Sequence, residues 1–232
     1  MSLDDLDTTY GRVWRDFIGG INIFIGIGGD SHGRRLFLAI QSIFMAVASC
    51  FRIFRECFGI SGGRAELYSG TQEFITLRRS ICRIVVICIG GNDLDSCTRP
   101  VKSPRMIADD IINLFLELTC SGKVVYFVGL PRRYTHRHVT AEEYELIRSS
   151  VDTKLRRQLK SRYILLPAEL LVQGAYRVEQ RSYGRPSMQV HLTNPNYTLL
   201  ANVVWDKILD DLQHQKSKPS TLAVIQRHLE RD

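Results

Sequence analysis

The chain has 232 residues, of which 44% are hydrophobic and 24% charged, a balance that excludes disordered, collagen-like and fibrous coiled-coil proteins. Lysine and arginine outnumber aspartate and glutamate by 31 to 24, which gives a net charge of +7 spread along the sequence in separate arginine pairs. This surplus indicates a solvated face, and weak contact with nucleic acid or an anionic membrane is a secondary hypothesis.

Apolar runs alternate with amphipathic segments along the chain. The apolar runs predict strands at 22–27, 52–60, 81–89, 123–130 and 163–166. Helices are predicted at 36–51, 104–119, 141–160 and 196–213. This alternation implies a parallel sheet covered on both faces, so we expect an α/β fold, a three-layer α/β/α sandwich. We expect this domain at residues 21–213, between an N-terminal extension (1–20) and a polar C-terminal tail (214–232).

The predicted helix at 36–51 is nearly all apolar and is flanked by arginines. It has 16 residues and contains Gln41, Ser42 and Ser49, so it is shorter than the ~20 residues that a membrane span requires. We favour a helix packed against the sheet, with a membrane-contacting helix as the alternative.

The cysteine spacing and the N-terminal segment indicate the cellular compartment of the protein. The six cysteines form no C-x-x-C pair and fit no zinc spacing, so we expect no metal site. Unpaired thiols favour a reducing compartment. The segment MSLDDLDTTY at the N-terminus is acidic and polar, unlike a secretory signal, and we therefore expect a cytoplasmic protein.

Three turns that follow predicted strands carry unusual residues. They are residues 28–33 (GGDSHG), 61–63 (SGG) and 90–93 (GGND). In a parallel sheet these turns lie at the carboxyl ends of the strands, which is where ligands bind in such folds. We therefore expect all three at one edge of the sheet.

Ser31 comes directly after the first predicted strand, at the start of a helix. A hydroxyl there lies near the positive end of the helix dipole and near free backbone N–H groups, which suits a nucleophile that attacks a carbonyl. The alternative is that Asp30 or Ser31 only caps the helix, a frequent role for both residue types.

The other two turns offer hydrogen-bond donors. The side-chain amide of Asn92 can donate to an oxyanion, and the preceding Gly90 and Gly91 allow the backbone to approach a ligand closely. Gly62 can supply a backbone N–H from the second turn. Both turns are equally compatible with an ordinary glycine-rich connection.

A general base is also needed, and His191 is the best candidate among the six histidines. It lies just before the last predicted helix, at the same edge of the sheet as Ser31. His32 is adjacent to Ser31 and is expected to point away from it.

These residues together resemble a known family. Gly29-Asp30-Ser31, Gly62, Gly90-Gly91-Asn92-Asp93 and Val190-His191-Leu192 are similar, in order and spacing, to the motifs of the SGNH (GDSL-type) esterases and lipases. The resemblance spans residue 23 to about residue 210. More narrowly, the segment GDSHGRRL resembles the cytosolic animal SGNH domains of retrotransposon-derived proteins.

The resemblance implies a serine ester hydrolase that cleaves acetyl or lipid esters without a metal or organic cofactor. Ser31 would be the nucleophile and His191 the base. The N–H groups of Ser31 and Gly62, with the Asn92 amide, would form the oxyanion hole. The implied sheet is flavodoxin-like, with five parallel strands in the order 2-1-3-4-5.

One position departs from the family pattern. The family places an aspartate three residues before the histidine, where this chain has Met188, which cannot accept the imidazole N–H. A backbone carbonyl, water or Ser187 would then have to orient His191 in a Ser–His dyad. The alternative function is therefore a catalytically weakened or inactive SGNH-like module that binds nucleic acid, a membrane or a protein.

The segment 26–31 (GIGGDS) also begins like a dinucleotide-binding fingerprint. Ser31 replaces its third glycine, and no acidic residue follows at the spacing that ribose recognition requires, so nucleotide binding is the weakest hypothesis.

Overall fold

Five parallel strands form one sheet in the computed structural model, which describes residues 23–47, 53–95, 102–179 and 187–217. The strands are β1 (Ile23–Gly29), β2 (Ile53–Gly59), β3 (Ile84–Cys88), β4 (Val124–Val128) and β5 (Tyr163–Ile164). Their order is β2-β1-β3-β4-β5. The predicted parallel sheet is confirmed, and so is the strand order that the resemblance implied.

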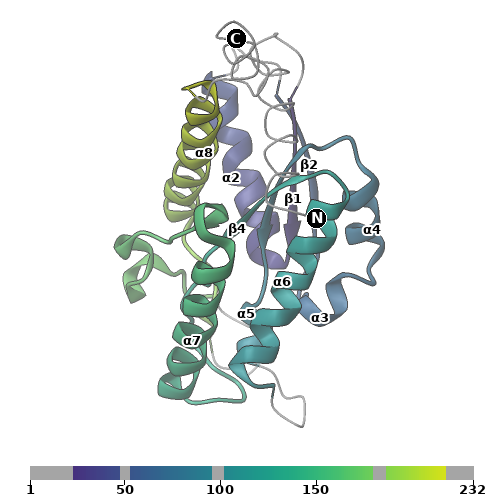
Figure 1. Ribbon diagram of the computed structural model, residues 1–232. Helices are drawn as coiled ribbons and strands as arrows, with labels where there is room; N and C mark the ends of the chain where they lie inside the picture. The colour runs from purple at the N-terminus through teal and green to yellow at the C-terminus, as the bar shows by residue number, and fades with distance from the viewer. Residues whose placement is uncertain (1–22, 48–52, 96–101, 180–186, 218–232) are drawn as a thin grey trace, which may run out of the picture.

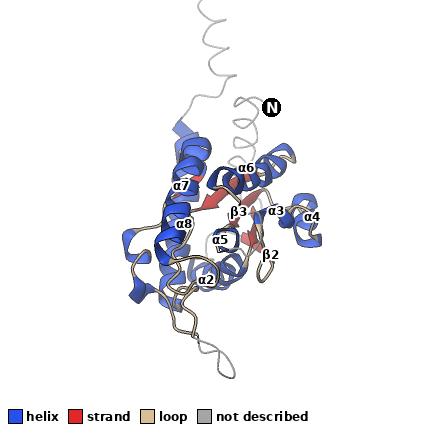
Figure 2. Cartoon of the chain, turned by 90° about the horizontal axis from the view of Figure 1, so that it is seen from below, coloured by secondary structure: helices blue, strands red, loops and turns tan. Residues whose placement is uncertain are grey.

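Helices cover both faces of this sheet, as Figures 1 and 2 show. One face packs against α2 (Ser31–Val47) and α8 (Asn194–Ser217). The other packs against α3 (Ala65–Tyr68), α4 (Gln72–Arg79), α6 (Pro104–Cys120) and α7 (Ala141–Leu159). The short α5 (Gly91–Leu94) follows β3. Single 3-10 turns lie at Lys160–Arg162, Ala168–Leu170 and Gln173–Ala175.

The central strands are apolar at every position because both of their faces are buried. In β3, Ile84 and Val86 contribute to the core under α2 and α8, whereas Val85 and Ile87 contribute to the core on the other side. Side chains alternate across a strand, so a strand between two helical layers needs apolar residues at successive positions.

The helix starts follow capping rules. The Ser103 hydroxyl accepts from the Met106 N–H in front of α6, and Pro104 occupies the first turn. Thr140 and Glu143 form a reciprocal capping box at the start of α7. The first helix begins at Ser31, the position expected for this hydroxyl and five residues before the apolar segment at 36–51, and Asp30 caps it.

Several elements differ from the sequence prediction. The short helices α3, α4 and α5 were not predicted, since segments of four to eight residues are too short to show helical periodicity. Helix α8 continues to Ser217, so the first residues of the expected tail at 214–232 are helical. The extension at 1–20 and the rest of the tail lie outside the described residues.

The apolar segment at 36–51 falls largely within α2. Leu36 and Ile40 on this helix are buried in the core against the sheet, at 0% and 4% exposure. Among the helices that the structure describes, none has both the length and the apolar character to cross a bilayer.

Candidate functional site

Ser31 is the first residue of α2, presented by a tight turn at the end of β1. Gly29 in this turn has φ +120°, and a Cβ there would lie 1.9 Å from the Cys88 carbonyl oxygen, so only glycine fits. Asp30 caps the helix, since its Oδ1 accepts from the His32 N–H at 2.8 Å. The Ser31 hydroxyl is thereby left for another partner, and its Oγ lies 2.8 Å from His191 Nε2.

His191 reaches Ser31 from a segment with little regular structure. Two isolated antiparallel bridges, Tyr176 with Leu192 and Glu179 with Met188, hold this segment together. The Arg177 N–H also donates to the His191 carbonyl oxygen at 2.9 Å. The imidazole is therefore placed by pairing between two stretches of chain that come from neither a named strand nor a helix.

Glu179 supplies the carboxylate that the sequence analysis did not find. Its Oε1 lies 3.0 Å from His191 Nδ1, so serine, histidine and glutamate form a continuous hydrogen-bonded chain. We expected a backbone carbonyl, water or Ser187 to orient the ring, and that prediction was wrong. Glu179 is paired through its backbone with Met188, the position at which a carboxylate was missing, and so approaches the ring from the opposite stretch.

Two arginines share the same carboxylate oxygen. Arg35 of α2 donates to Glu179 Oε1 at 3.1 Å, and Arg177 donates to it as well. Burial opposes ionisation of Glu179, but the hydrogen bonds from Arg177 and His191 outweigh it and lower the pKa of this carboxyl below its usual 4.5. Glu179 is therefore ionised at neutral pH.

The His191 imidazole is held neutral. Burial, followed by the positive charge of Arg35, lowers the pKa of His191 below its usual 6.5, and the nearby Glu179 carboxylate only partly offsets these effects. A neutral imidazole whose Nδ1–H donates to a carboxylate leaves the Nε2 lone pair facing the Ser31 hydroxyl.

His32, which was expected to point away from Ser31, lies beside the His191 ring. Its ring centroid is 5.1 Å from that of His191, and its Nδ1 lies 2.8 Å from the Tyr197 hydroxyl oxygen. Burial keeps the pKa of His32 well below its usual value, so it is a neutral packing partner for the His191 ring.

The second and third turns are joined to each other. The Asn92 Nδ2 donates to the Gly63 carbonyl oxygen at 2.9 Å. The Asp93 carboxylate accepts from the Ala65 N–H at 3.0 and 3.2 Å. Gly62, adjacent to Gly63, is exposed and has φ +74°, and its N–H donates no backbone hydrogen bond to any described residue.

The third turn also adjoins the turn that carries Ser31. A Cβ built on Gly91 would lie 3.8 Å from Asp30 Oδ2, so the start of α5 is next to the residue that precedes Ser31. Burial raises the pKa of Asp30 to about 7, although the His32 N–H and Arg133 oppose this shift. Asp30 and Asp93 are thus buried supports behind the turns.

A small, mostly apolar pocket lies beneath these turns. Asp30, His32 and Gly91 form one part of its wall, and Leu166, Leu192 and Leu200 form another. Within the described residues, no group of three histidine, cysteine or acidic side chains is placed to hold a metal ion.

No protein-family model and no curated protein matches the sequence, but solved structures match the fold. A GDSL-like lipase from Bacteroides thetaiotaomicron matches with a TM-score of 0.57 and 12% identity, covering 89% of this chain and 98% of its own. A lipase/acylhydrolase from Enterococcus faecalis matches with a TM-score of 0.56 and 14% identity, covering 81% and 95% respectively. A psychrotrophic esterase from a Pseudoalteromonas species matches with a TM-score of 0.54 and 14% identity, covering 82% and 98%. At these identities the likeness shows the fold alone, that of SGNH (GDSL-like) hydrolases.

Proposed function

We propose that the protein is a serine hydrolase of carboxylic esters. The observation that carries the proposal is the hydrogen-bonded chain from Ser31 Oγ through His191 to Glu179, at 2.8 and 3.0 Å. A hydroxyl paired with a neutral imidazole, which a carboxylate orients in turn, is the arrangement that activates serine as a nucleophile.

The chemistry follows from the positions of the protons. His191 Nε2 takes the Ser31 hydroxyl proton while Oγ bonds to the ester carbonyl carbon, whose π electrons move to the carbonyl oxygen. When the carbonyl re-forms, the C–O bond to the alcohol breaks and His191 returns its proton to the departing alkoxide. A water molecule then repeats both steps on the acyl-enzyme, releasing the acid and restoring Ser31.

The negative oxygen of each tetrahedral intermediate needs donors that are already in place. Ser31 begins a helix, so its N–H has no intrahelical acceptor. The Gly62 N–H and the second amide proton of Asn92 come from the two joined turns. We assign these three donors to the oxyanion hole, because fixed donors gain strength in a site from which substrate excludes water.

A fluorophosphonate probe tests the proposal directly, since it phosphonylates only an activated serine. We expect labelling of the wild type and hydrolysis of p-nitrophenyl acetate and longer p-nitrophenyl esters. Ser31→Ala and His191→Ala should abolish labelling and lower kcat by about 10⁴-fold or more. Folded wild-type protein that neither reacts with the probe nor hydrolyses any of these esters would refute the proposal.

The alternative of a silent binding module rested on the missing carboxylate at Met188 and on the net charge of +7, and Glu179 removes the first of these grounds. An acetyl or lipid ester preference, kinship with retrotransposon-associated domains, a cytoplasmic location and contact with nucleic acid or anionic membranes stay predictions. Nucleic-acid binding through the basic surface would weaken steeply with salt, and no affinity at low salt would refute it.

A further inference from the structure

Arg133 holds a buried cation directly behind Asn92. Its Nη2 donates to Asn92 Oδ1 at 2.7 Å, and its Nη1 lies 3.6 Å from Asp95 Oδ2. The side chains of Arg133 and Asp95 are only 8% and 2% exposed. A guanidinium in such a place is costly to bury, so its contact with a neutral amide calls for a reason.

The two contacts of the Asn92 side chain fix which way its amide faces. Oδ1 accepts from the Arg133 guanidinium, while Nδ2 donates one of its two hydrogens to the Gly63 carbonyl. A flipped amide would place its NH₂ group against the cation and its oxygen against the carbonyl, so both contacts would turn repulsive. Only one N–H of Asn92 is then left, in a single orientation.

We propose that Arg133 is a positioning residue for the oxyanion hole, which locks and polarises the Asn92 amide. This inference rests on the proposed ester hydrolysis. A charge-assisted hydrogen bond to the amide oxygen draws electron density from the NH₂ group, which strengthens its remaining N–H as a donor. A stronger N–H donor stabilises the substrate oxygen most when that oxygen becomes negative. Arg133 therefore acts on the transition state through Asn92.

Gly91 provides the space for this arrangement. A Cβ on residue 91 would lie 3.3 Å from Arg133 Nη2, a tight contact from which the guanidinium would have to move by a few tenths of an ångström, and 3.7 Å from its Nε, an ordinary contact. The glycine just before Asn92 thus leaves room for the guanidinium at its present distance from the turn.

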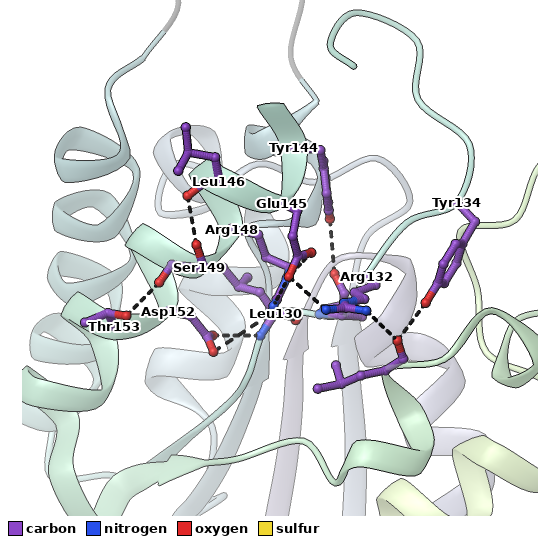
Figure 3. Close-up of polar contacts among 12 residues, drawn as sticks. Leu130, Arg132, Tyr134, Tyr144, Glu145, Leu146, Arg148, Ser149, Asp152 and Thr153 are labelled. Atoms are coloured by element: carbon purple, nitrogen blue, oxygen red, sulfur yellow. Dashed lines mark hydrogen bonds and ion pairs between the residues drawn. The ribbon is translucent and has the colours of Figure 1, made fainter. Parts of the chain in front are cut away.

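The loop that carries Arg133 is fixed on both sides, and Figure 3 shows its contacts with residues of α7. Arg148 of α7 donates to the Leu130 carbonyl at 3.2 Å, and the Tyr144 hydroxyl donates to the Pro131 carbonyl at 3.1 Å. On the other side, the Arg132 N–H donates to the Tyr176 hydroxyl at 2.9 Å. A cation on so anchored a loop can hold its partner in one place.

A double-mutant cycle between Arg133 and Asn92 tests the inference. We expect Arg133→Met to lower kcat on p-nitrophenyl acetate between about 10-fold and 100-fold with little change in KM. In an Asn92→Ala background, the same substitution should change kcat by less than about two-fold, since the donor it acts on is gone. Arg133→Lys keeps the positive charge but loses the planar guanidinium, so its kcat should lie between those of wild type and Arg133→Met. This variant replaces Arg133→Met in the cycle if Arg133→Met does not fold.

A readout that does not need turnover separates this inference from the proposed function. The side-chain ¹⁵N–¹H signals of Asn92, identified by their absence from Asn92→Ala, should shift in Arg133→Met. The same signals should not shift in Arg137→Met, the matched control, which removes an exposed arginine from the same loop. Equal losses from Arg133→Met with and without Asn92, or unchanged amide signals, would overturn the inference. A wild type that lacks esterase activity refutes the proposed function and the effect on kcat, whereas a shifted amide signal would still support the positioning contact.

Discussion

The two halves of the candidate site are built in different ways. Ser31 and Asn92 sit on turns at the ends of β1 and β3, where backbone bonds such as Asp30 N–H to the Cys88 carbonyl set their positions. Glu179 and His191 sit on a segment between β5 and α8 that belongs to no named strand, and two isolated bridges pair its described residues. Its key carboxylate is held by side-chain contacts, including one from Arg35 on α2.

The side chains of the first half are thus positioned by the fold, and those of the second half by interactions between charged groups. The sheet edge brings its turns together whatever their side chains are, because parallel strands end at a common edge. The second half depends on the identities of a few ionic groups. Substitutions there should change the state of the base, whereas substitutions in the first half should remove donors without altering the base.

The largest expected effect in the second half comes from Glu179→Gln. The amide is close in size but cannot stabilise the imidazolium and can favour the wrong tautomer, so we expect kcat to fall by about 10⁴-fold, as for the aspartate of a protease triad. Ester hydrolysis measured beside Glu169→Gln, an exposed carboxylate of the same segment, checks this. A loss below about tenfold would mean that Ser31 and His191 work as a dyad.

In the first half, Asn92→Ala should cost about 10²- to 10³-fold in kcat, the usual effect of deleting one oxyanion donor. The pH dependence should stay that of wild type, because Asn92 does not contact His191. Asn113→Ala, an exposed asparagine on α6, is the matched control and should be neutral. A shifted pH profile in Asn92→Ala would contradict the separation between the two halves.

The fold was predictable because it depends on periodicity and on chain order. Apolar runs such as β3 and β4 are buried on both faces, and that is visible in the sequence. The turns after β1 and β3 carry glycine where the backbone requires it, so their place at one edge followed. The short helices α3, α4 and α5 could not be predicted, because they depend on tertiary contacts such as that between Asp93 and Ala65.

Glu179 was missed because the prediction looked for an acid at a fixed distance from His191 along the chain. The carboxylate comes instead from across an antiparallel pairing, and no spacing rule describes that. One signal was available: Glu179 is the only acidic residue between Glu169 and Asp206, so it is the one carboxylate near His191 in the sequence. The position of the His32 ring depends on its packing with Tyr197, so it could not be predicted from the sequence either.

Arg35 allows a test of charge control by pH. Only neutral His191 can act as the base, and its lowered pKa places the acid limb of kcat/KM below pH 6.5. Arg35→Met removes a positive charge that lowers this pKa, so the limb should move to higher pH while the plateau changes less. Arg34→Met, its exposed neighbour, should leave the limb in place. A limb that moves to lower pH in Arg35→Met would contradict this account.

The smallest effect is expected from Met188→Asp, which places an acid three residues before His191, where the SGNH-type esterases that the sequence resembles have one. Met188 and Glu179 exchange both backbone hydrogen bonds, at 2.7 and 2.9 Å, so their side chains share one face of the pairing. His191 Nδ1 already has its carboxylate, so kcat should change by less than about two-fold.

The same substitution becomes informative when Glu179 is disabled. In a Glu179→Gln background, Met188→Asp should recover at least about tenfold of the lost rate, because the new carboxylate lies beside the one that was removed. A rise of about tenfold or more from Met188→Asp alone would contradict the assignment, since it would mean that His191 lacks an effective partner in the wild type. Recovery confined to the double variant would instead show that the site requires one carboxylate at Nδ1 and accepts it from either stretch of chain.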